Sequence, residues 1–195
     1  MRSVACIAPV VLVAFAVAAC GDSASTPAVD APRYGLGTAP DSARLVAWDR
    51  DIGPEGAELP LGRGTVAEGR TLFTQQCAAC HGANGEGMAP AFPQLVGRPE
   101  AGESFDFSSQ PDLPRTIGNY WPHATTLFDY IQRAMPLFTP GSLTDDQTYA
   151  LTAYLLAANR VIPDTTTLDA AALRAVRMPA RDRFVPDDRA LGGIR

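Results

Sequence analysis

The sequence contains no lysine, since all 16 of its basic residues are arginine. Its formal net charge is −5, and the arginines form neither a run nor a basic face. Nucleic-acid backbones are bound through clustered basic residues, so the composition excludes a nucleic acid as the expected partner. Docking through a ring of lysines is excluded as well.

Cysteine and histidine are also scarce. A structural zinc site needs four Cys or His ligands, and the few residues of these types are too dispersed to supply them. A thioredoxin-like dithiol belongs to a βαβ pattern, whereas the flanks of the one close cysteine pair predict a helix followed by a loop rich in Gly and Pro. The complete set is Cys6, Cys20, Cys77, Cys80, His81 and His123.

The close pair forms a C-x-x-C-H motif, Cys77-Ala78-Ala79-Cys80-His81. Two cysteines one helical turn apart can bond the two vinyl groups of a porphyrin as thioethers, and the adjacent histidine can bind its iron. The motif occurs once. It therefore predicts one covalently bound haem c, with His81 as an iron ligand.

The first twenty residues have the pattern of an export signal. A basic start is followed by an apolar run from Val4 to Ala19 that is short for a membrane span. The junction Val17-Ala18-Ala19-Cys20 resembles a bacterial lipobox. We expect a lipoprotein signal peptide over 1–19 and a lipid anchor at Cys20 in the periplasm. Ordinary signal peptidase cleavage without lipidation is the alternative.

The remaining chain divides by composition. Residues 20–63 are rich in Ala, Pro, Asp and Gly without a sustained period, which predicts a flexible linker. Its apolar cluster of Leu45, Val46 and Trp48 is expected to dock on the domain or on a partner, with the domain favoured. A compact domain is predicted over 64–162, and the extension over 163–195 is expected to wrap its surface.

Capping boxes predict where two helices begin. Thr65 with Glu68 and Thr144 with Gln147 pair a hydroxyl residue with an acid or amide three places later. The first helix is expected to run into the haem motif, and the second to end near Asn159.

A further helix is predicted over 125–134, because Leu127, Phe128 and Ile131 recur at helical spacing before Met135-Pro136. Together these elements predict an all-α fold.

Over roughly 64–162 the chain resembles class I c-type cytochromes. The first helix carries Gly-x-x-x-Phe and the last carries Leu-x-x-Tyr, here Gly69, Phe73, Leu151 and Tyr154. The resemblance implies a class I cytochrome c fold, in which these two helices cross and the helices pack round one haem.

The resemblance also implies roles for residues around the haem. The carbonyl of Pro93 would accept a hydrogen bond from His81, and Leu95 would pack on the porphyrin. Tyr120 and Trp121 lie in the segment that carries donors to the haem propionates, although a plain core role fits both. Arg98 and Arg115 are weaker candidates for the same task.

The second iron ligand is predicted to be Met135, which precedes a proline and stands ahead of the last helix, as the family's methionine does. A thioether ligand raises the reduction potential of haem iron. The alternatives that stay open are His123, Met88 and Met178.

A narrower resemblance rests on several segments, among them Gly118-Asn119-Tyr120-Trp121-Pro122 and Val176-Arg177-Met178-Pro179. They are similar to the cytochrome subunits of bacterial sulfite dehydrogenases and of sulfane-sulfur dehydrogenase. The tail departs from that pattern at Ala180 and Arg183.

This resemblance implies an electron-transfer protein that does no bond-making chemistry itself. Electrons would come from a molybdenum-cofactor dehydrogenase and leave to a downstream cytochrome or an oxidase. The alternatives are a membrane-tethered respiratory shuttle without a dedicated dehydrogenase and a haem peroxidase with an open iron position.

Overall fold

The computed structural model describes residues 34, 36–98, 107 and 110–185. The predicted signal peptide, Cys20 and the end of the C-terminal extension lie outside these residues. The chain divides into two units, Met1–Pro40 and Asp41–Arg195, and every helix and strand described below belongs to the second.

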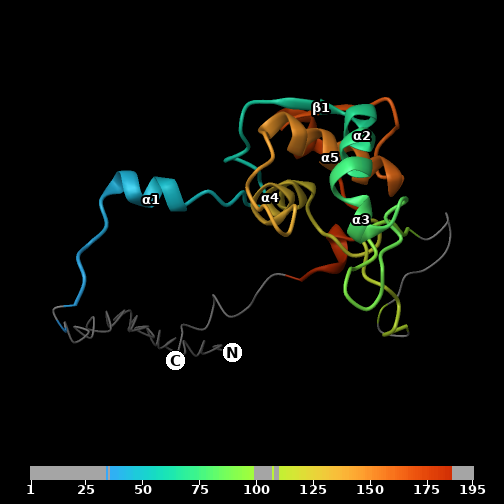
Figure 1. The fold of residues 1–195 in the computed structure, drawn as a ribbon, viewed down its shortest axis with the longest axis horizontal. Helices are drawn as coiled ribbons and strands as arrows, with labels where there is room; N and C mark the ends of the chain where they lie inside the picture. Colours follow the sequence, from blue (N-terminus) through green and yellow to red (C-terminus); the bar gives the residue numbers. More distant parts are fainter. Residues whose placement is uncertain (1–33, 35, 99–106, 108–109, 186–195) are drawn as a thin grey trace, which may run out of the picture. The chain divides into compact units, whose positions relative to one another are not determined.

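The second unit is mainly helical (Figure 1). Its only described sheet pairs two short strands antiparallel, with Gly64 opposite Leu168. The predicted all-α class is confirmed apart from this two-stranded sheet. In chain order the elements are α1 (Ser42–Trp48), β1 (Arg63–Thr65), α2 (Val66–Gln76), α3 (Ala78–His81), α4 (Ala124–Ala134), α5 (Asp145–Ala158), β2 (Thr167–Asp169), α6 (Ala170–Ala175) and the 3-10 helix η1 (Arg181–Arg183).

Both predicted capping boxes are present. The Thr65 hydroxyl accepts the Glu68 N–H while the Glu68 carboxylate accepts the Thr65 N–H, and Thr144 and Gln147 exchange the same pair of bonds. Each box satisfies backbone donors that a helix start leaves without partners. The two capping boxes therefore predict the first residue of α2 and of α5 correctly.

Helices α2 and α5 cross at very close range. A Cβ atom added to Gly69 would lie 1.8 Å from the carbonyl oxygen of Ala150, so only glycine fits. Beside this contact the rings of Phe73 and Tyr154 pack with centroids 5.1 Å apart. The predicted crossing of the Gly-x-x-x-Phe and Leu-x-x-Tyr helices is confirmed, and it positions the start of the haem motif.

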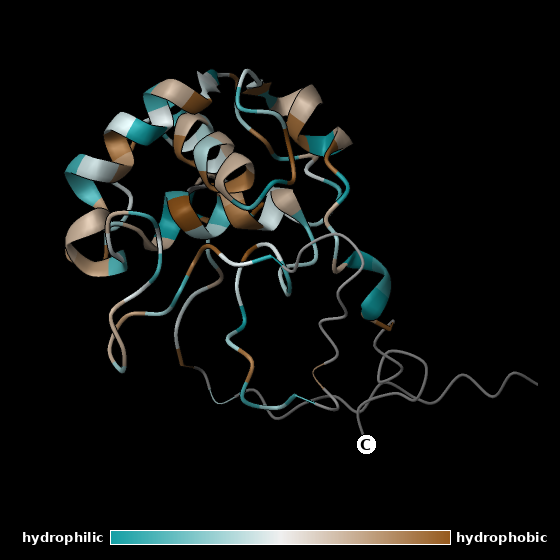
Figure 2. Cartoon of the chain, turned by 90° about the vertical axis from the view of Figure 1, so that its right-hand side faces the viewer, coloured by the Kyte–Doolittle hydropathy of each residue, from teal (hydrophilic) through white to brown (hydrophobic). Residues whose placement is uncertain are grey.

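Helix α4 packs against α5 and completes the core. The buried Phe128 of α4 lies 4.5 Å from the ring of Tyr149 of α5, measured between centroids. One long connection joins α3 to α4. Its described parts, 82–98 and 110–123, lie together on one side of the helices, as the two views show (Figures 1 and 2). Hydrophobic positions are concentrated on the packed helices (Figure 2).

The segment before β1 corrects the predicted linker, because residues 51–63 pack on the domain. Ile52 is buried, and its N–H donates to the Asp129 carboxylate at 2.9 Å. The Tyr149 hydroxyl donates to the Pro60 carbonyl at 2.8 Å. These contacts to α4 and α5 place the start of the compact domain ahead of Gly64.

Helix α1 lies within the predicted linker and is capped by Asp41, whose carboxylate accepts the Arg44 N–H. Its apolar side chains are exposed, with Trp48 at 83% and Val46 at 72%. The expected docking of this cluster on the domain is therefore not observed.

The described part of the C-terminal extension enters the core, whereas the sequence predicted that it would wrap the surface. Leu173 of α6, Met178 and Ala180 are all buried. Strand β2 pairs with β1, so the extension also closes one end of the domain. None of the helices that the structure describes is long and apolar enough to cross a membrane.

Candidate cofactor site

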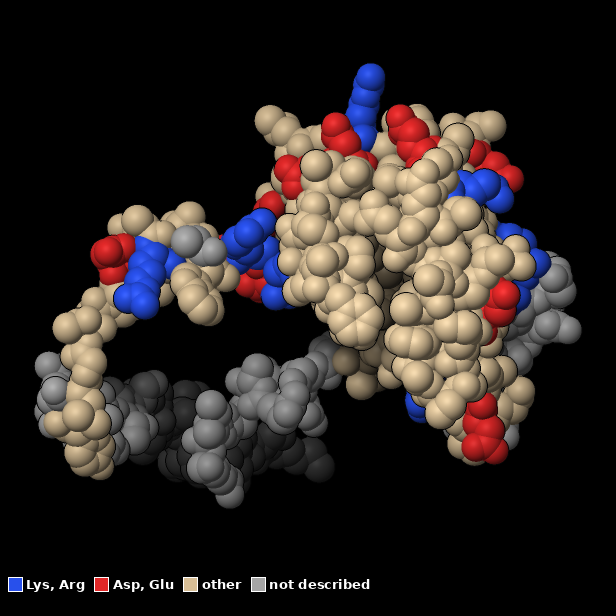
Figure 3. Space-filling view, viewed as in Figure 1, with Lys and Arg blue, Asp and Glu red and all other residues tan. Residues whose placement is uncertain are grey.

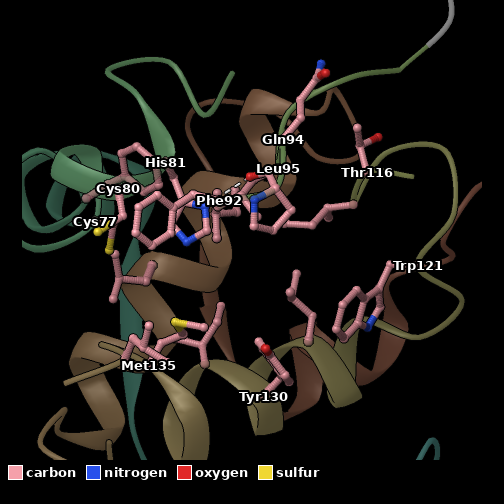
Figure 4. Close-up of a pocket in the computed structure, with 18 of the residues that line it drawn as sticks. Cys77, Cys80, His81, Phe92, Gln94, Leu95, Thr116, Trp121, Tyr130 and Met135 are labelled. Atoms are coloured by element: carbon pink, nitrogen blue, oxygen red, sulfur yellow. Dashed lines mark hydrogen bonds between the residues drawn. The ribbon is translucent and has the colours of Figure 1, made fainter. Parts of the chain in front are cut away.

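A cavity of about 750 Å³ opens on the loop side of the helices, a size suited to a cofactor. Its walls come from α2, α3, α4 and α5, from the loops around them, and from Phe184 of the C-terminal extension. Figure 4 shows the thiols at one end of the cavity and Trp121 at the other. The structure brings all the predicted site residues to it, namely Cys77, Cys80, His81, Pro93, Leu95, Tyr120, Trp121 and Met135.

The motif forms a separate turn rather than continuing α2. Cys77 leaves the helical conformation with φ at −120°, and its carbonyl then accepts the N–H groups of Cys80 and His81 at 3.1 and 2.9 Å. This break lets Cys77 and the short helix α3 present both thiols and the imidazole to one cavity. No disulfide joins the two cysteines.

Burial, and secondly the neighbouring Cys80, raises the pKa of Cys77 to about 11. Redox dithiols have low-pKa thiolates, so the environment of this pair is opposite to that of a thioredoxin-like site.

His81 is oriented by the loop opposite it. Its Nδ1 lies 3.1 Å from the carbonyl oxygen of Pro93. A carbonyl only accepts hydrogen bonds, so the contact requires the proton on Nδ1 and leaves Nε2 with a free lone pair. The hydrogen bond implied by the sequence resemblance is present, and it holds the tautomer that can bind iron.

The loop that carries Pro93 is folded back on the motif. The Gly85 carbonyl accepts the N–H groups of Leu95 and Val96 at 2.8 and 3.0 Å, and the Gly87 N–H donates to the His81 carbonyl at 2.7 Å. Gly85 has φ at +76°, where a side chain would be strained and would also meet Val96. The loop is thereby closed tightly enough to keep Pro93 beside His81.

Asn159, at the end of α5, supports the site and was missed by sequence reasoning. Its buried side-chain amide accepts the Gly97 N–H at 2.9 Å and donates to the Leu95 carbonyl at 3.2 Å. It joins the loop that lines the cavity to the end of α5. An asparagine after a helix also reads as an ordinary C-terminal cap, so the sequence held no signal for this role.

Met135 lies across the cavity from His81 (Figure 4). The residue ends α4 and its N–H still donates to Ile131, which fixes where the side chain leaves the helix. The other candidate ligands do not line the cavity. Met178 is packed in the core, and Met88 is half exposed on the neighbouring loop.

His123 is engaged elsewhere. Its Nδ1 lies 2.7 Å from the guanidinium of Arg181 and accepts a hydrogen bond from it. Burial, and secondly the positive charge of Arg181, lowers the pKa of His123, with Glu55 acting in the opposite direction. This histidine joins the start of α4 to η1.

The two aromatic candidates for propionate binding differ in their contacts. The Trp121 indole N–H donates to the Thr126 hydroxyl at 3.0 Å, so it is already used within the protein. Tyr120 is stacked edge to face between Phe107 and Phe184, with both centroid distances 5.4 Å.

The two arginine candidates also differ in their positions relative to the cavity. Arg115 lines the cavity and lies over the Tyr120 ring, 5.3 Å from its centroid. Arg98 does not line the cavity, and its guanidinium donates to the carbonyl of Arg160. Of these two arginines, Arg115 is therefore the one that the structure brings to the cavity.

The residues of the cavity fit a covalently bound haem. Two thiols, one imidazole with its lone pair free and one thioether meet around walls that are largely apolar. Imidazole nitrogen and thioether sulfur are both haem-iron ligands, and with both in place no iron position is left for a substrate. Such an arrangement suits the transfer of single electrons.

Comparisons with known proteins agree with this geometry. Residues 66–159 match the family model of cytochrome c. The fold matches a chain of the sulfane dehydrogenase SoxCD from Paracoccus pantotrophus with a TM-score of 0.66 and 36% sequence identity, covering 83% of this chain and 76% of that one.

Two curated relatives are thiosulfate dehydrogenases. The protein of Stutzerimonas stutzeri is 28% identical over 127 residues, which cover 58% of this chain and 37% of the relative. That of Psychrobacter arcticus is 26% identical over 127 residues, covering 65% and 33%. The chain thus spans about a third of the length of these relatives.

Proposed function

This chain belongs to the cytochrome c family and carries haem c, and we propose that it relays single electrons from a molybdenum-cofactor dehydrogenase of sulfur compounds to a downstream cytochrome or oxidase. The observation that supports this most is the meeting of His81 and Met135 across one apolar cavity that also receives both thiols. A bound haem supplies a one-electron Fe(III)/Fe(II) couple.

The chain's own residues would perform three tasks in the relay. Cys77 and Cys80 would hold the haem covalently, so that it is not lost on reduction. His81, oriented by Pro93, and Met135 would hold the iron. Apolar walls would exclude water and thereby favour the less charged, reduced iron.

The nature of the partner is supported by the structural match to a chain of a sulfane dehydrogenase. Two relatives named as thiosulfate dehydrogenases point to the same class of substrate. A dehydrogenase that removes two electrons from a sulfur compound can pass them on one at a time to a haem whose iron has both ligand positions filled.

The ligand assignment is tested on purified, haem-loaded protein. The wild type should show a low-spin spectrum with the weak Met-sulfur to Fe(III) absorption band. Met135→Ala should lose the band, whereas Met178→Ala should keep it, because Met178 lies in the core. Loss of the band in Met178→Ala alone would reverse the assignment.

The partner assignment is tested by isolating the native complex and adding sulfite or thiosulfate. We expect a molybdenum protein in the complex and reduction of the haem by at least one of these compounds. Haem reduction by a sulfur compound in the isolated chain would make the chain an enzyme itself. A complex without molybdenum, or a haem that stays oxidised, would contradict the proposed partner. The alternative would then be a general respiratory electron shuttle.

We also propose that the protein is exported and held at a membrane through a lipid on Cys20. The Ala-rich lipobox at 17–20 supports this. Mass spectrometry of the mature N-terminus should find a lipidated Cys20, and Cys20→Ala should release the protein in soluble form. A mature chain that starts elsewhere without lipid would contradict the anchor.

A further inference from the structure

The C-terminal extension contributes a side chain to the cofactor cavity. Phe184 lines this cavity, although it lies well beyond the match to the cytochrome c family model, which covers 66–159. The matched segment by itself therefore leaves this part of the wall unfilled. We call the segment 176–185 the strap.

The strap is fastened to the domain at several points. Met178 and Ala180 are buried, which anchors its middle. The Arg181 guanidinium then donates to Nδ1 of His123 at 2.7 Å, and this bond joins η1 to the start of α4. The Arg181 carbonyl accepts the Phe184 N–H at 3.4 Å. Phe184 therefore follows directly on an anchored turn.

At the cavity, Phe184 supports an aromatic neighbour. Its ring packs edge to face on Tyr120 with the centroids 5.4 Å apart, and both residues line the cavity. Tyr120 packs on Phe107 at the same distance, and Arg115 lies over both of those rings. Removing Phe184 would take away one of the two rings that hold Tyr120 in place.

Few charges face the cavity. Of the lining residues that the structure describes, Arg115 is the only one with a permanent charge. Figure 3 shows a hollow on one face, bordered by surface that is neither blue nor red, while charged side chains lie farther out. Water is then the polar medium that can come nearest to the cofactor, so the side chains that exclude water set much of the local polarity.

Resting on the proposed one-electron relay, we infer that Phe184 closes one wall of the haem cavity against water and thereby raises the reduction potential of the haem. The side chain is 44% exposed, so it separates the cavity from solvent. Reduction lowers the positive charge of haem iron, and a dry apolar wall favours the less charged state. The strap thus sets how readily the haem accepts an electron.

Redox titration of the haem-loaded protein tests the inference. Phe184→Ala should lower the equilibrium constant for reduction about tenfold, a fall of ~59 mV for one electron. Val185→Ala is the matched control, because Val185 is the next residue, is 87% exposed and does not line the cavity. Its potential should equal that of the wild type. An unshifted potential in Phe184→Ala overturns the inference.

Phe184→Leu separates the wall from the aromatic contact. Leucine keeps an apolar side chain at the cavity but removes the ring that packs on Tyr120. The potential of this variant should lie closer to that of the wild type than to that of Phe184→Ala. A potential equal to that of Phe184→Ala would assign the effect to the ring contact, and exclusion of water would then be wrong as the cause.

A pair of arginines tests the fastening of the strap. Arg181 donates to His123 outside the strap, whereas Arg177 pairs with Asp182 inside it. Either change to alanine removes one positive charge, so long-range charge effects are matched. Arg181→Ala should lower the equilibrium constant for reduction about threefold, and Arg177→Ala should lower it much less. Equal losses would show that only the charge acts, which overturns the role of the strap.

Two readouts separate this inference from the proposed function. The Met-sulfur to Fe(III) band should persist in every variant, and its loss in Phe184→Ala would make Phe184 a support of the iron ligand instead of a wall. A wild-type haem without a reversible one-electron couple contradicts the proposed function. A reversible wild-type couple with no shift in Phe184→Ala contradicts this inference alone.

Discussion

The α2–α5 crossing and the cofactor cavity are two halves of one domain that are held in different ways. At the crossing, protein packs on protein so closely that Gly69 has no room for a methyl group against Ala150. At the cavity, apolar side chains from four helices and several loops surround about 750 Å³ of space. At the crossing, the chain supplies both packing surfaces. At the cavity, the apolar walls need the haem as their packing partner.

The largest expected effect comes from preventing haem attachment with Cys77→Ser and Cys80→Ser. Without the haem the apolar walls of this cavity of about 750 Å³ lose their packing partner and face water. A domain is usually stable by only ~5–15 kcal/mol, so a loss of apolar burial on this scale removes much of that margin. Far-UV circular dichroism and NMR should show that the haem-free variant has no unique fold. A cooperative unfolding transition in that variant would show that the crossing alone sustains the domain.

The crossing itself is broken by Gly69→Ala. The added methyl group must push the two backbones apart, and overpacking of this kind costs about 3 kcal/mol. Denaturant unfolding of the haem-loaded protein measures the loss. Gly53→Ala is the control, because a Cβ there meets only Glu55 and Glu58 oxygens at 3.9 Å, and its effect should stay within about 0.5 kcal/mol.

A smaller effect is expected where the segment before β1 joins the domain. Asp129→Ala removes the acceptor of the buried Ile52 N–H and should destabilise the protein by about 2 kcal/mol. Limited proteolysis should then cut within 51–62 first. Arg133→Ala breaks only the ion pair of a half-exposed arginine with Asp129 and should cost about 0.5 kcal/mol. Equal losses in both variants would assign the anchoring to the ion pair.

The smallest effect is a pH dependence from His123. Burial and Arg181 hold its pKa below the ordinary value of 6.5, so protonation favours the unfolded chain. Its contribution to stability is complete above pH 6.5 and falls as the pH drops below that value. The melting temperature of wild type should therefore decline between pH 7 and pH 5 more than that of His123→Asn. Identical declines would show that the Arg181 contact does not depend on the protonation of His123.

Sequence reasoning succeeded where a feature is local. Thr65 with Glu68 and Thr144 with Gln147 each form a capping box within four residues, so the helix starts follow from the sequence. The spacing of Leu127, Phe128 and Ile131, with Met135-Pro136 as the end signal, gave α4 to within one residue. These signals involve neighbours along one helix, and no distant contact is needed to read them.

Sequence reasoning failed where a single residue meets a distant partner. Ile52 and Pro60 bind α4 and α5 through isolated contacts, so no period marked residues 51–63 as part of the domain. Strands β1 and β2 are three residues each, which is too short for an alternating pattern. Trp121 lies at the cavity as expected, but its indole N–H was already committed to Thr126.

The sequence by itself determined the attachment chemistry, because the two cysteines and the histidine of the motif act within one turn of chain. Tertiary structure alone decided that Met135 reaches the cavity, that Met178 is buried in the core, and that His123 bonds to Arg181. A thioether or an imidazole has the same chemistry at any position, so its role depends on which side of the packed helices it emerges. Long-range packing of α2, α4 and α5 makes that choice.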